Sequence, residues 1–449
     1  MKSALLMATV ALSSSASIAQ AAGIATAGQT TAAATNSSSR FDPAPVVAEI
    51  RRIIGEEYVL PERRPALDAV LAEGLSSGRY KLSDPALFAQ RLNEDLARVG
   101  RDHHLNFNYN PQMVAAMTAG RRGPGPAAER GPPPGQVDAA RRENHGLREL
   151  RVLPGNVRYL DLNGFEWIGE ESEAVINSAM AFLKGGDAVI IDLRRNGGGA
   201  GRAVHQFISY FVKPDTPLIT FYKGGAASPT MRSLPGLSSM VGKPLYVLTS
   251  GGSGSAAEEF VGHVAGYKLG EVVGEATSGA AYMNAIFPVD GRFELSVSVA
   301  RPVLAATGKD WEATGIAPTI AVPPEAALQT AHVHAIRKLA AAADPSRRAA
   351  LEGLAEGIEA SSRPGTPAAP LTAYVGTYGD RHVSLDGGKL WLQQQRRLRR
   401  LMVPLGGNRF TLAEDPSMRV EFNVAGGRST SFSQGPAGGP VLARFERTR

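Results

Sequence analysis

The stretch that decides the fold is residues 188–199, AVIIDLRRNGGG. An apolar run ends here in an aspartate and then three glycines, which predicts a buried strand that stops at a glycine turn. A segment with helical periodicity follows at 201–212. The same order returns where a strand predicted over Leu245–Thr249 leads into a glycine-rich turn and a helix at 256–267. Strands that alternate with helices in this way predict an α/β core.

This core extends in both directions, over about 147–345. On the N-terminal side we predict a strand over Val157–Leu162 and a helix over 170–184. On the C-terminal side, apolar residues alternate from Phe293 to Val299, which is typical of a strand. A helix at about 325–342 ends the unit.

Residues 43–110 are predicted to form a helical N-terminal domain. The sequence Ser83-Asp84-Pro85 inside it is a helix-start signal. Apolar residues recur at helical spacing in two runs, which are Val46, Val47, Ile50, Ile53 and Ile54, and then Leu67, Val70, Leu71 and Leu75.

A Pro/Gly-rich loop is predicted over 111–146. Its two densest stretches are GPGP at 123–126 and GPPPG at 131–135. Neither suits a helix or a strand, because proline lacks a backbone N–H and glycine favours turns. Arginines in this segment could contact an anion, but we interpret it as a solvated loop.

The C-terminal part is predicted as a linker over 346–370 and a small β-rich module over 371–449. Short alternating runs there are separated by turn pairs, at Asp386-Gly387, Gly406-Gly407 and Gly426-Gly427. The basic run RRLRR at 396–400 is interpreted as a solvated strand or turn, with a polyanion site as the alternative. The module could bind substrate, the cell envelope or a partner protein.

The N-terminus is predicted to be a secretory signal peptide over 1–21. Lys2 precedes a short apolar stretch, and Ala19-Gln20-Ala21 fits an A-x-A cleavage site. A buried N-terminal helix is the alternative. Residues 22–42, rich in Ala, Thr, Gly and Ser, are predicted to be a flexible tether. We therefore expect a periplasmic or secreted protein, without a transmembrane segment because no run of 18 apolar residues occurs.

The composition excludes several kinds of site. The 449 residues include no cysteine, so disulfides, thiolate metal sites and cysteine nucleophiles are excluded. A net charge of +6 is mild for this length and no pattern of a nucleic-acid-binding domain occurs, so no nucleic-acid partner is predicted. The metalloprotease motif HExxH is absent, and His332-Val333-His334 is assigned to an ordinary helix. We predict no metal and no other cofactor.

Two glycine-rich turns carry residues suited to catalysis. The backbone N–H groups of the turn at 192–199 could face a phosphate or an oxyanion, although the turn matches neither a P-loop nor a dinucleotide fingerprint. The segment Ser250–Glu258 places serines at a helix start, where the helix dipole favours an anion and the next N–H can serve an oxyanion. A serine that only caps the helix is the alternative.

Two further segments supply a base and a carboxylate. Asp102-His103-His104-Leu105 follows the helical region, and a histidine is the usual base for a nucleophilic serine. Glu312, within Trp311–Pro318, could orient such a base. The alternatives are a histidine at the surface or core edge and an ordinary loop carboxylate.

Taken in this order, the segments resemble peptidase family S41, a family of serine peptidases, over about 45–325. Its members include the C-terminal processing proteases, the tricorn core and the interphotoreceptor retinoid-binding protein repeats. The resemblance implies a crotonase-like α/β core with a helical N-terminal region. The motifs that carry it are Asp192–Gly199 (D-L-R-x-N-x-G-G), Ser253–Glu258 (S-x-S-A-x-E), Val273–Gly279 (V-G-E-x-T-x-G) and Trp311–Pro318 (E-G-x-G-x-x-P).

The resemblance also implies roles for individual residues. Ser255 matches the nucleophile, His104 the base, and Glu312 the carboxylate that steadies the base. The N–H groups of Gly198 and Ala256 match the oxyanion hole.

One further position indicates the branch of the family. The processing proteases have a lysine base where Ala280 stands here, so the tricorn-like branch is the closer resemblance. His103 stands where that branch has a serine, and Lys268 is not expected to be the base. The roughly 50 residues between His104 and the strand at 157 leave little room for a PDZ domain, and we expect none.

Three functions are therefore weighed. The first is an exported serine endopeptidase with a Ser-His-Glu site and a peptide or protein substrate. The second is a non-catalytic binding protein for apolar ligands or peptides, since the fold carries apolar ligands in retinoid-binding relatives. The third is a serine hydrolase that acts on a small ester. The combination of Ser255, His104 and Glu312 favours the first.

Overall fold

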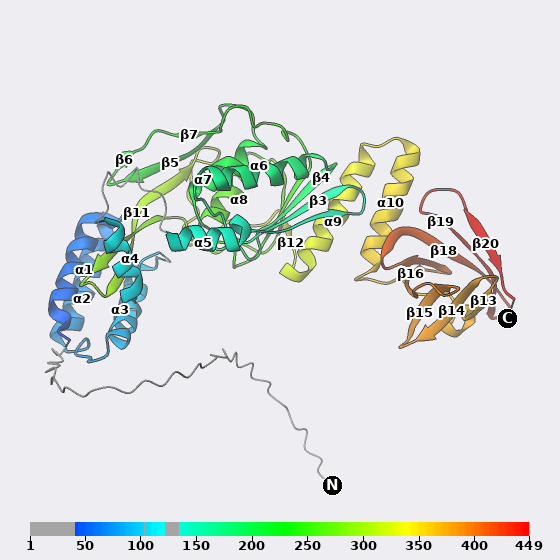
Figure 1. The fold of residues 1–449 in the computed structure, drawn as a ribbon, viewed down its shortest axis with the longest axis horizontal. Helices are drawn as coiled ribbons and strands as arrows, with labels where there is room; N and C mark the ends of the chain where they lie inside the picture. The colour runs from blue at the N-terminus through cyan, green and yellow to red at the C-terminus, as the bar shows by residue number, and fades with distance from the viewer. Residues whose placement is uncertain (1–40, 103, 122–133, 449) are drawn as a thin grey trace, which may run out of the picture. The chain divides into compact units, whose positions relative to one another are not determined.

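The computed structural model describes residues 41–102, 104–121 and 134–448 (Figure 1). The predicted signal peptide and nearly all of the predicted tether lie outside these residues. Within them, the chain has the predicted mixed α/β core, a helical N-terminal region and a C-terminal β-sheet. Among the described helices, none combines the length and the apolar character that a bilayer crossing needs.

A mixed six-stranded sheet forms the centre of the core, in the order β12-β9-β8-β4-β3-β2. Neighbouring strands are parallel, except that β2 and β3 run antiparallel. The strands predicted at 157–162 and 245–249 have the observed bounds. The bounds are β2 (Leu147–Leu153), β3 (Val157–Leu162), β4 (Ala188–Asp192), β8 (Leu245–Thr249), β9 (Glu271–Gly274) and β12 (Ile320–Ala321).

Helices cover both faces of this sheet (Figure 1). One face packs against α6 (Glu170–Lys184), α7 (Gly201–Ser209) and α8 (Ala256–Gly266), and the other against α9 (Pro324–Ala341). The first four residues of β4 are all apolar because both faces of the strand are buried, and Asp192 ends it. Because β4 and β8 are parallel neighbours, their C-terminal ends and the two glycine turns that follow lie at the same edge of the sheet.

A second six-stranded sheet is built around the long strand β11 (Phe293–Leu304). This strand pairs antiparallel with β1, β5 and β10, and β5 pairs in turn with β6 and β7. Of the strands in this sheet, only β11 is predicted from the sequence. The other strands are β1 (Asn106–Tyr109), β5 (Pro217–Lys223), β6 (Ala226–Ala227), β7 (Met231–Arg232) and β10 (Met283–Val289).

Three helices lie within the predicted helical domain of 43–110, namely α1 (Pro43–Glu57), α2 (Arg64–Ser76) and α3 (Pro85–Gly100), but its last part forms the strand β1 and not a helix. The predicted start signal at α3 is real, since the Asp84 carboxylate accepts a hydrogen bond from the N–H of Ala86 at 2.8 Å. The apolar faces of these helices pack against β11, so the helices share a core with the second sheet.

Two predictions of irregular structure are wrong. The predicted loop at 111–146 contains α4 (Pro111–Arg121), α5 (Pro134–Arg142) and a short 3-10 helix, whereas its Pro/Gly-dense centre at 122–133 lies outside the described residues. The predicted linker at 346–370 is helical over its first part, in α10 (Pro345–Ala360). In all three α-helices proline is the first residue, where its missing N–H would have no helical partner, so it begins the helix instead of interrupting it.

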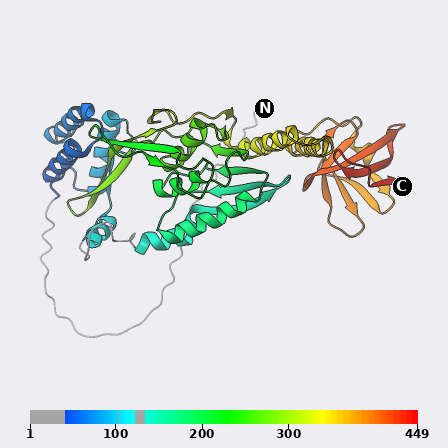
Figure 2. The ribbon, with the colours of Figure 1, turned by 90° about the horizontal axis from the view of Figure 1, so that it is seen from above.

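The C-terminal module is an eight-stranded antiparallel sheet of sequential neighbours around an aromatic core. Figure 2 shows these strands, orange to red, curving around a common interior, and Tyr378 forms a bridge with Arg447 just after the last strand. The basic residues 396–399 lie in an exposed turn, which confirms the solvated interpretation. The strands are β13 (Gly376–Tyr378), β14 (Arg381–Asp386), β15 (Lys389–Gln394), β16 (Arg400–Gly406), β17 (Arg409–Leu412), β18 (Asp415–Ala425), β19 (Arg428–Pro436) and β20 (Ala443–Glu446).

Candidate active site

Ser255 lies immediately before α8, at the end of the glycine turn that follows β8. Its backbone has φ 52° and ψ −119°, a conformation that side chains with a Cβ rarely adopt. Such strain persists only where surrounding contacts fix the residue, and it is concentrated at functional sites. Ser255 is the N-cap of α8, in a capping box with Glu258, but a helix cap does not require this strained backbone, so the half-buried serine is held for more than capping.

Gly198 lies directly against Ser255. A Cβ added to Gly198 would be 2.7 Å from Ser255 Cβ and 3.2 Å from the backbone nitrogen of Ala256. Gly198 also has a φ of 120°, so the position requires glycine for both space and conformation. Ala256 begins α8, and the first N–H groups of a helix have no partner within it. The structure thus brings together the three backbone positions predicted for the nucleophile and the oxyanion hole.

The N–H of Gly198 already has an acceptor. It donates to the side-chain oxygen of Asn196, at 2.9 Å and away from solvent. Gly198 can therefore serve an oxyanion only if its N–H is shared with Asn196 or leaves it. The N–H of Ala256, at the positive end of α8, is the better placed of the two donors.

Glu258 is the functional residue that sequence reasoning missed. Its side chain is fully buried and both carboxylate oxygens accept hydrogen bonds, five in all. The donors are the N–H groups of Ser255 (2.9 Å), Gly279 (2.7 Å) and Ala280 (2.8 Å) and the hydroxyls of Thr277 (2.6 Å) and Ser278 (3.2 Å). A glutamate three residues after a serine at a helix start is a capping-box signal, which could have identified it. Glu258 thus binds the Ser255 turn to the segment 277–280.

Glu312 is held by the next residues of that same segment. One of its carboxylate oxygens accepts hydrogen bonds from the N–H groups of Ala281 (2.7 Å) and Tyr282 (3.2 Å). The other oxygen is buried without a hydrogen-bond partner among the described residues. Burial raises the pKa of Glu312 from 4.5 to about 7; the negative charge of Asp102 contributes to the rise, and the two N–H donors oppose it.

His104 is fixed through its backbone. Its N–H donates to a carboxylate oxygen of Asp102 at 2.8 Å, and its carbonyl accepts from the hydroxyl of Ser296 at 2.6 Å. Because the charge of Asp102 acts on Glu312, the segments that carry the predicted base and the predicted carboxylate face the same region. His103, which stands in the predicted relay position, lies outside the described residues.

These contacts connect four of the five predicted residues, and His104 is tied instead to Asp102 and Ser296. Gly198 and Ala256 flank Ser255, Glu258 links Ser255 to Ala280, and Glu312 is bound to the next residue in the chain. A contact between the hydroxyl of Ser255 and the imidazole of His104, which general-base catalysis requires, belongs to the proposal below. Within the described ranges, no group of three His, Asp or Glu side chains is arranged to hold a metal ion.

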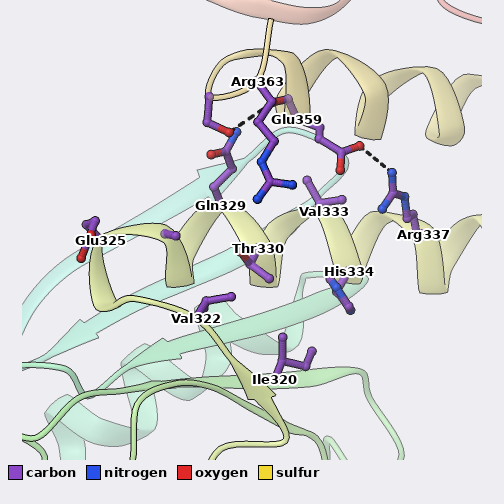
Figure 3. A pocket seen from close by; sticks show the side chains of 12 residues that line it. Ile320, Val322, Glu325, Gln329, Thr330, Val333, His334, Arg337, Glu359 and Arg363 are labelled. Carbon is purple, nitrogen blue, oxygen red and sulfur yellow. Dashed lines mark hydrogen bonds and ion pairs between the residues drawn. The ribbon is translucent and has the colours of Figure 1, made fainter.

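A pocket of about 530 Å3 lies elsewhere, between β12, α9 and the end of α10 (Figure 3). Ile320 contributes to its apolar floor, and an ion pair of Arg337 with Glu359 lies at its rim (2.6 Å). It is on the α9 face of the central sheet, whereas α8 covers the opposite face. The pocket is therefore separate from the Ser255 turn.

The raised pKa of Glu312 predicts a pH effect on stability. Folded Glu312 keeps its proton up to about pH 7 while the unfolded chain releases it near 4.5, so the free energy of unfolding falls as pH rises through that window. The neutral amide of a Glu312→Gln variant imitates the protonated form. Between pH 4.5 and pH 8 the wild type should therefore lose roughly 1–2 kcal/mol relative to Glu312→Gln, after allowance for solvent screening. Urea denaturation at both pH values measures this, and an equal difference at both would contradict it.

Comparison with known proteins identifies a family that part of the chain matches. Residues 156–322 match the model of Peptidase family S41. Among solved structures, a photosystem II D1 C-terminal processing protease is similar with 18% identity over 62% of this chain and 93% of that chain, at a TM-score of 0.44. A putative peptidase from Parabacteroides merdae has 18% identity over 63% and 90% (TM-score 0.42), and a lipoprotein from Streptococcus agalactiae 16% over 65% and 96% (TM-score 0.44). The matched region contains Gly198, Ser255 and Glu312, whereas His104 precedes it.

Proposed function

Because residues 156–322 belong to peptidase family S41, a family of serine peptidases, we propose that this protein hydrolyses peptide bonds with Ser255 as the nucleophile. The observation that carries the proposal is the strained backbone of Ser255, which is held against Gly198 at the start of α8. A nucleophile on a sharp turn between a strand and a helix presents its hydroxyl to a substrate, with the next N–H at hand for the oxyanion.

The proposed reaction is acyl transfer in two halves. His104 removes the hydroxyl proton of Ser255 while the oxygen attacks the peptide carbonyl carbon, and the N–H of Ala256, with that of Gly198, binds the oxyanion. The C–N bond then breaks, and His104 gives its proton to the leaving amine. Water repeats the sequence on the acyl-enzyme and restores Ser255. Glu312 stabilises the imidazolium of His104 in both halves.

The finer parts of the assignment have different support. The helix-covered parallel strands and the glycine turns at one sheet edge support a crotonase-like core. The absence of a lysine at Ala280 supports the Ser-His-Glu arrangement over a Ser-Lys dyad. Export rests on the sequence of residues 1–21 and on nothing beyond it.

Covalent labelling tests the proposal. A fluorophosphonate probe should attach to the peptide that contains Ser255, as located by mass spectrometry, and the Ser255→Ala variant should not be labelled. Ser250→Ala is the matched control, because Ser250 lies in the same turn and its hydroxyl donates to the carbonyl of Arg194 at 2.6 Å. We expect Ser250→Ala to keep the label on Ser255. A wild type that neither hydrolyses casein nor is labelled by the probe would instead support the binding-protein alternative.

A further inference from the structure

We infer that Asp102 is a positioning residue that, together with Ser296 and Ser298 of β11, clamps the backbone of His104. The inference deepens the proposed function, on which it rests, because it explains how a base on a segment outside the family-matched region is fixed in place. None of the three residues is assigned a reacting role.

The clamp grips His104 on both sides of its Cα. Asp102 accepts the N–H of His104 at 2.8 Å, and the same carboxylate oxygen accepts the hydroxyl of Ser298 at 3.0 Å. Ser296 donates its hydroxyl to the carbonyl of His104 at 2.6 Å. These hydroxyls belong to a strand far along the chain, since Ser296 is 192 residues from His104 and Ser298 is 196 residues from Asp102. They therefore tie the His104 segment to β11 and not only to its own sequence neighbours.

The clamp continues the pairing of β1 with β11. Asn106, two residues after His104, is in register with Ser296, and Phe107 with Leu295. The carbonyl of His104 is bound to β11 directly through Ser296, and its N–H is bound to β11 only through Asp102 and Ser298, so the histidine is tied to the strand that β1 pairs with. Only the two side-chain torsions of His104 then remain to be set, and a catalytic group displaced by about 1 Å can lose about 10²-fold in rate.

The clamp also explains two buried polar residues on an otherwise apolar strand. Ser296 and Ser298 are 5% and 0% exposed, and they lie on the same face of β11, two residues apart. The opposite face of the strand, with Leu295 and Val297, packs into the helical core. Buried hydroxyls need partners, and both donate to the His104 segment, while the Ser296 hydroxyl also accepts from the side-chain amide of Asn284 at 2.7 Å. Asp102 is itself 8% exposed and closes the arrangement from the other side.

The test compares kcat and KM of four variants. Asp102→Ala removes the acceptor, and we expect kcat to fall about 10²-fold with KM within about twofold of wild type. Asp102→Asn keeps one oxygen that can accept from both donors, and we expect kcat within about fivefold of wild type. Ser296→Ala with Ser298→Ala should approach the effect of Asp102→Ala. The control is Ser209→Ala, a buried serine of α7 that donates to the carbonyl of His205 and should leave both constants unchanged.

Three outcomes would overturn the clamp. Asp102→Ala could behave like Ser209→Ala, Asp102→Asn could lose as much as Asp102→Ala, which would indicate charge instead of geometry, or KM could rise in place of the fall in kcat. Hydrogen exchange of the peptide spanning 102–107 gives a readout without catalysis. The His104 amide should be protected in wild type and Asp102→Asn and exposed to exchange in Asp102→Ala. This pattern in a wild type without hydrolysis would defeat the proposed function and leave the clamp standing.

Discussion

Ser255→Gly is expected to give a protein that is inactive and yet more stable than the wild type. The loss of activity follows from the loss of the nucleophile, which in serine peptidases lowers kcat by about 10⁴- to 10⁶-fold. The gain in stability follows from the backbone, because glycine adopts φ 52°, ψ −119° without the penalty that a Cβ imposes there.

The expected gain is roughly 0.5–1.5 kcal/mol in the free energy of unfolding. Relief of a strained conformation of this kind is worth about 1–3 kcal/mol, and the extra freedom of glycine in the unfolded chain offsets about 0.5–1 kcal/mol of it. Urea denaturation measures the stability, and hydrolysis of casein the activity. Ser255→Ala is the matched control, since it removes the hydroxyl but keeps the Cβ.

The two variants together separate function from strain. Ser255→Ala should be as inactive as Ser255→Gly but no more stable than the wild type. If Ser255→Gly proves less stable than Ser255→Ala, the turn does not store strain at Ser255, and the observation that carries the proposed function is lost. If both variants keep hydrolysing casein, Ser255 is not the nucleophile.

The parts of the fold that could be predicted are those with strong periodicity. The strand at 157–162 and the helix at 170–184 have the predicted bounds because each is apolar on the side that it buries. The strands β1 and β5 were not predicted because β1 alternates over only four residues and β5 shows no alternation. Their pairing with β11 is decided by residues far along the chain.

The helix α10 was missed although a start signal precedes it. The prediction of a linker over 346–370 rests on the Pro/Gly/Ser stretch near 361–370, whereas Asp344-Pro345 repeats the start signal that predicted α3 at Asp84-Pro85. The carboxylate of Asp344 accepts hydrogen bonds from the N–H groups of Ser346 and Arg347, so α10 begins in the same way. Applied evenly, the rule would have found this helix.

The candidate site could be predicted in its residue types but not in its connections. The sequence indicates a serine, a histidine and a glutamate, yet nothing local shows that Glu258 and Glu312 bind consecutive residues of 277–282. Likewise, Ser296 and Ser298 look like the polar side of a half-exposed strand. Their burial and their hydrogen bonds to the His104 segment depend on tertiary structure.

Glu258→Gln is expected to lower hydrolysis at least about 10²-fold and to destabilise the protein, although the side chain keeps its size. Five donors point at the two oxygens of Glu258, and three of them are backbone N–H groups that cannot turn away. An amide replaces one acceptor with a donor, which leaves at least one buried N–H facing an NH2 group. Each buried donor without a partner costs about 1–3 kcal/mol, so we expect a loss of roughly 2–4 kcal/mol in the free energy of unfolding.

The activity loss follows from geometry, since the displaced donors belong to the residues that hold Ser255 and adjoin the Glu312 contact. We expect at least about a 10²-fold fall in kcat at temperatures where the variant is fully folded by circular dichroism.

Glu259→Gln is the matched control. Glu259 is the next residue of α8 and is 8% exposed, and its near neighbour His263 lies 3.6 Å away. Glu259→Gln should keep most of the activity, and equal losses in the two variants would show that Glu258 acts through the stability of α8 and not by holding the Ser255 turn.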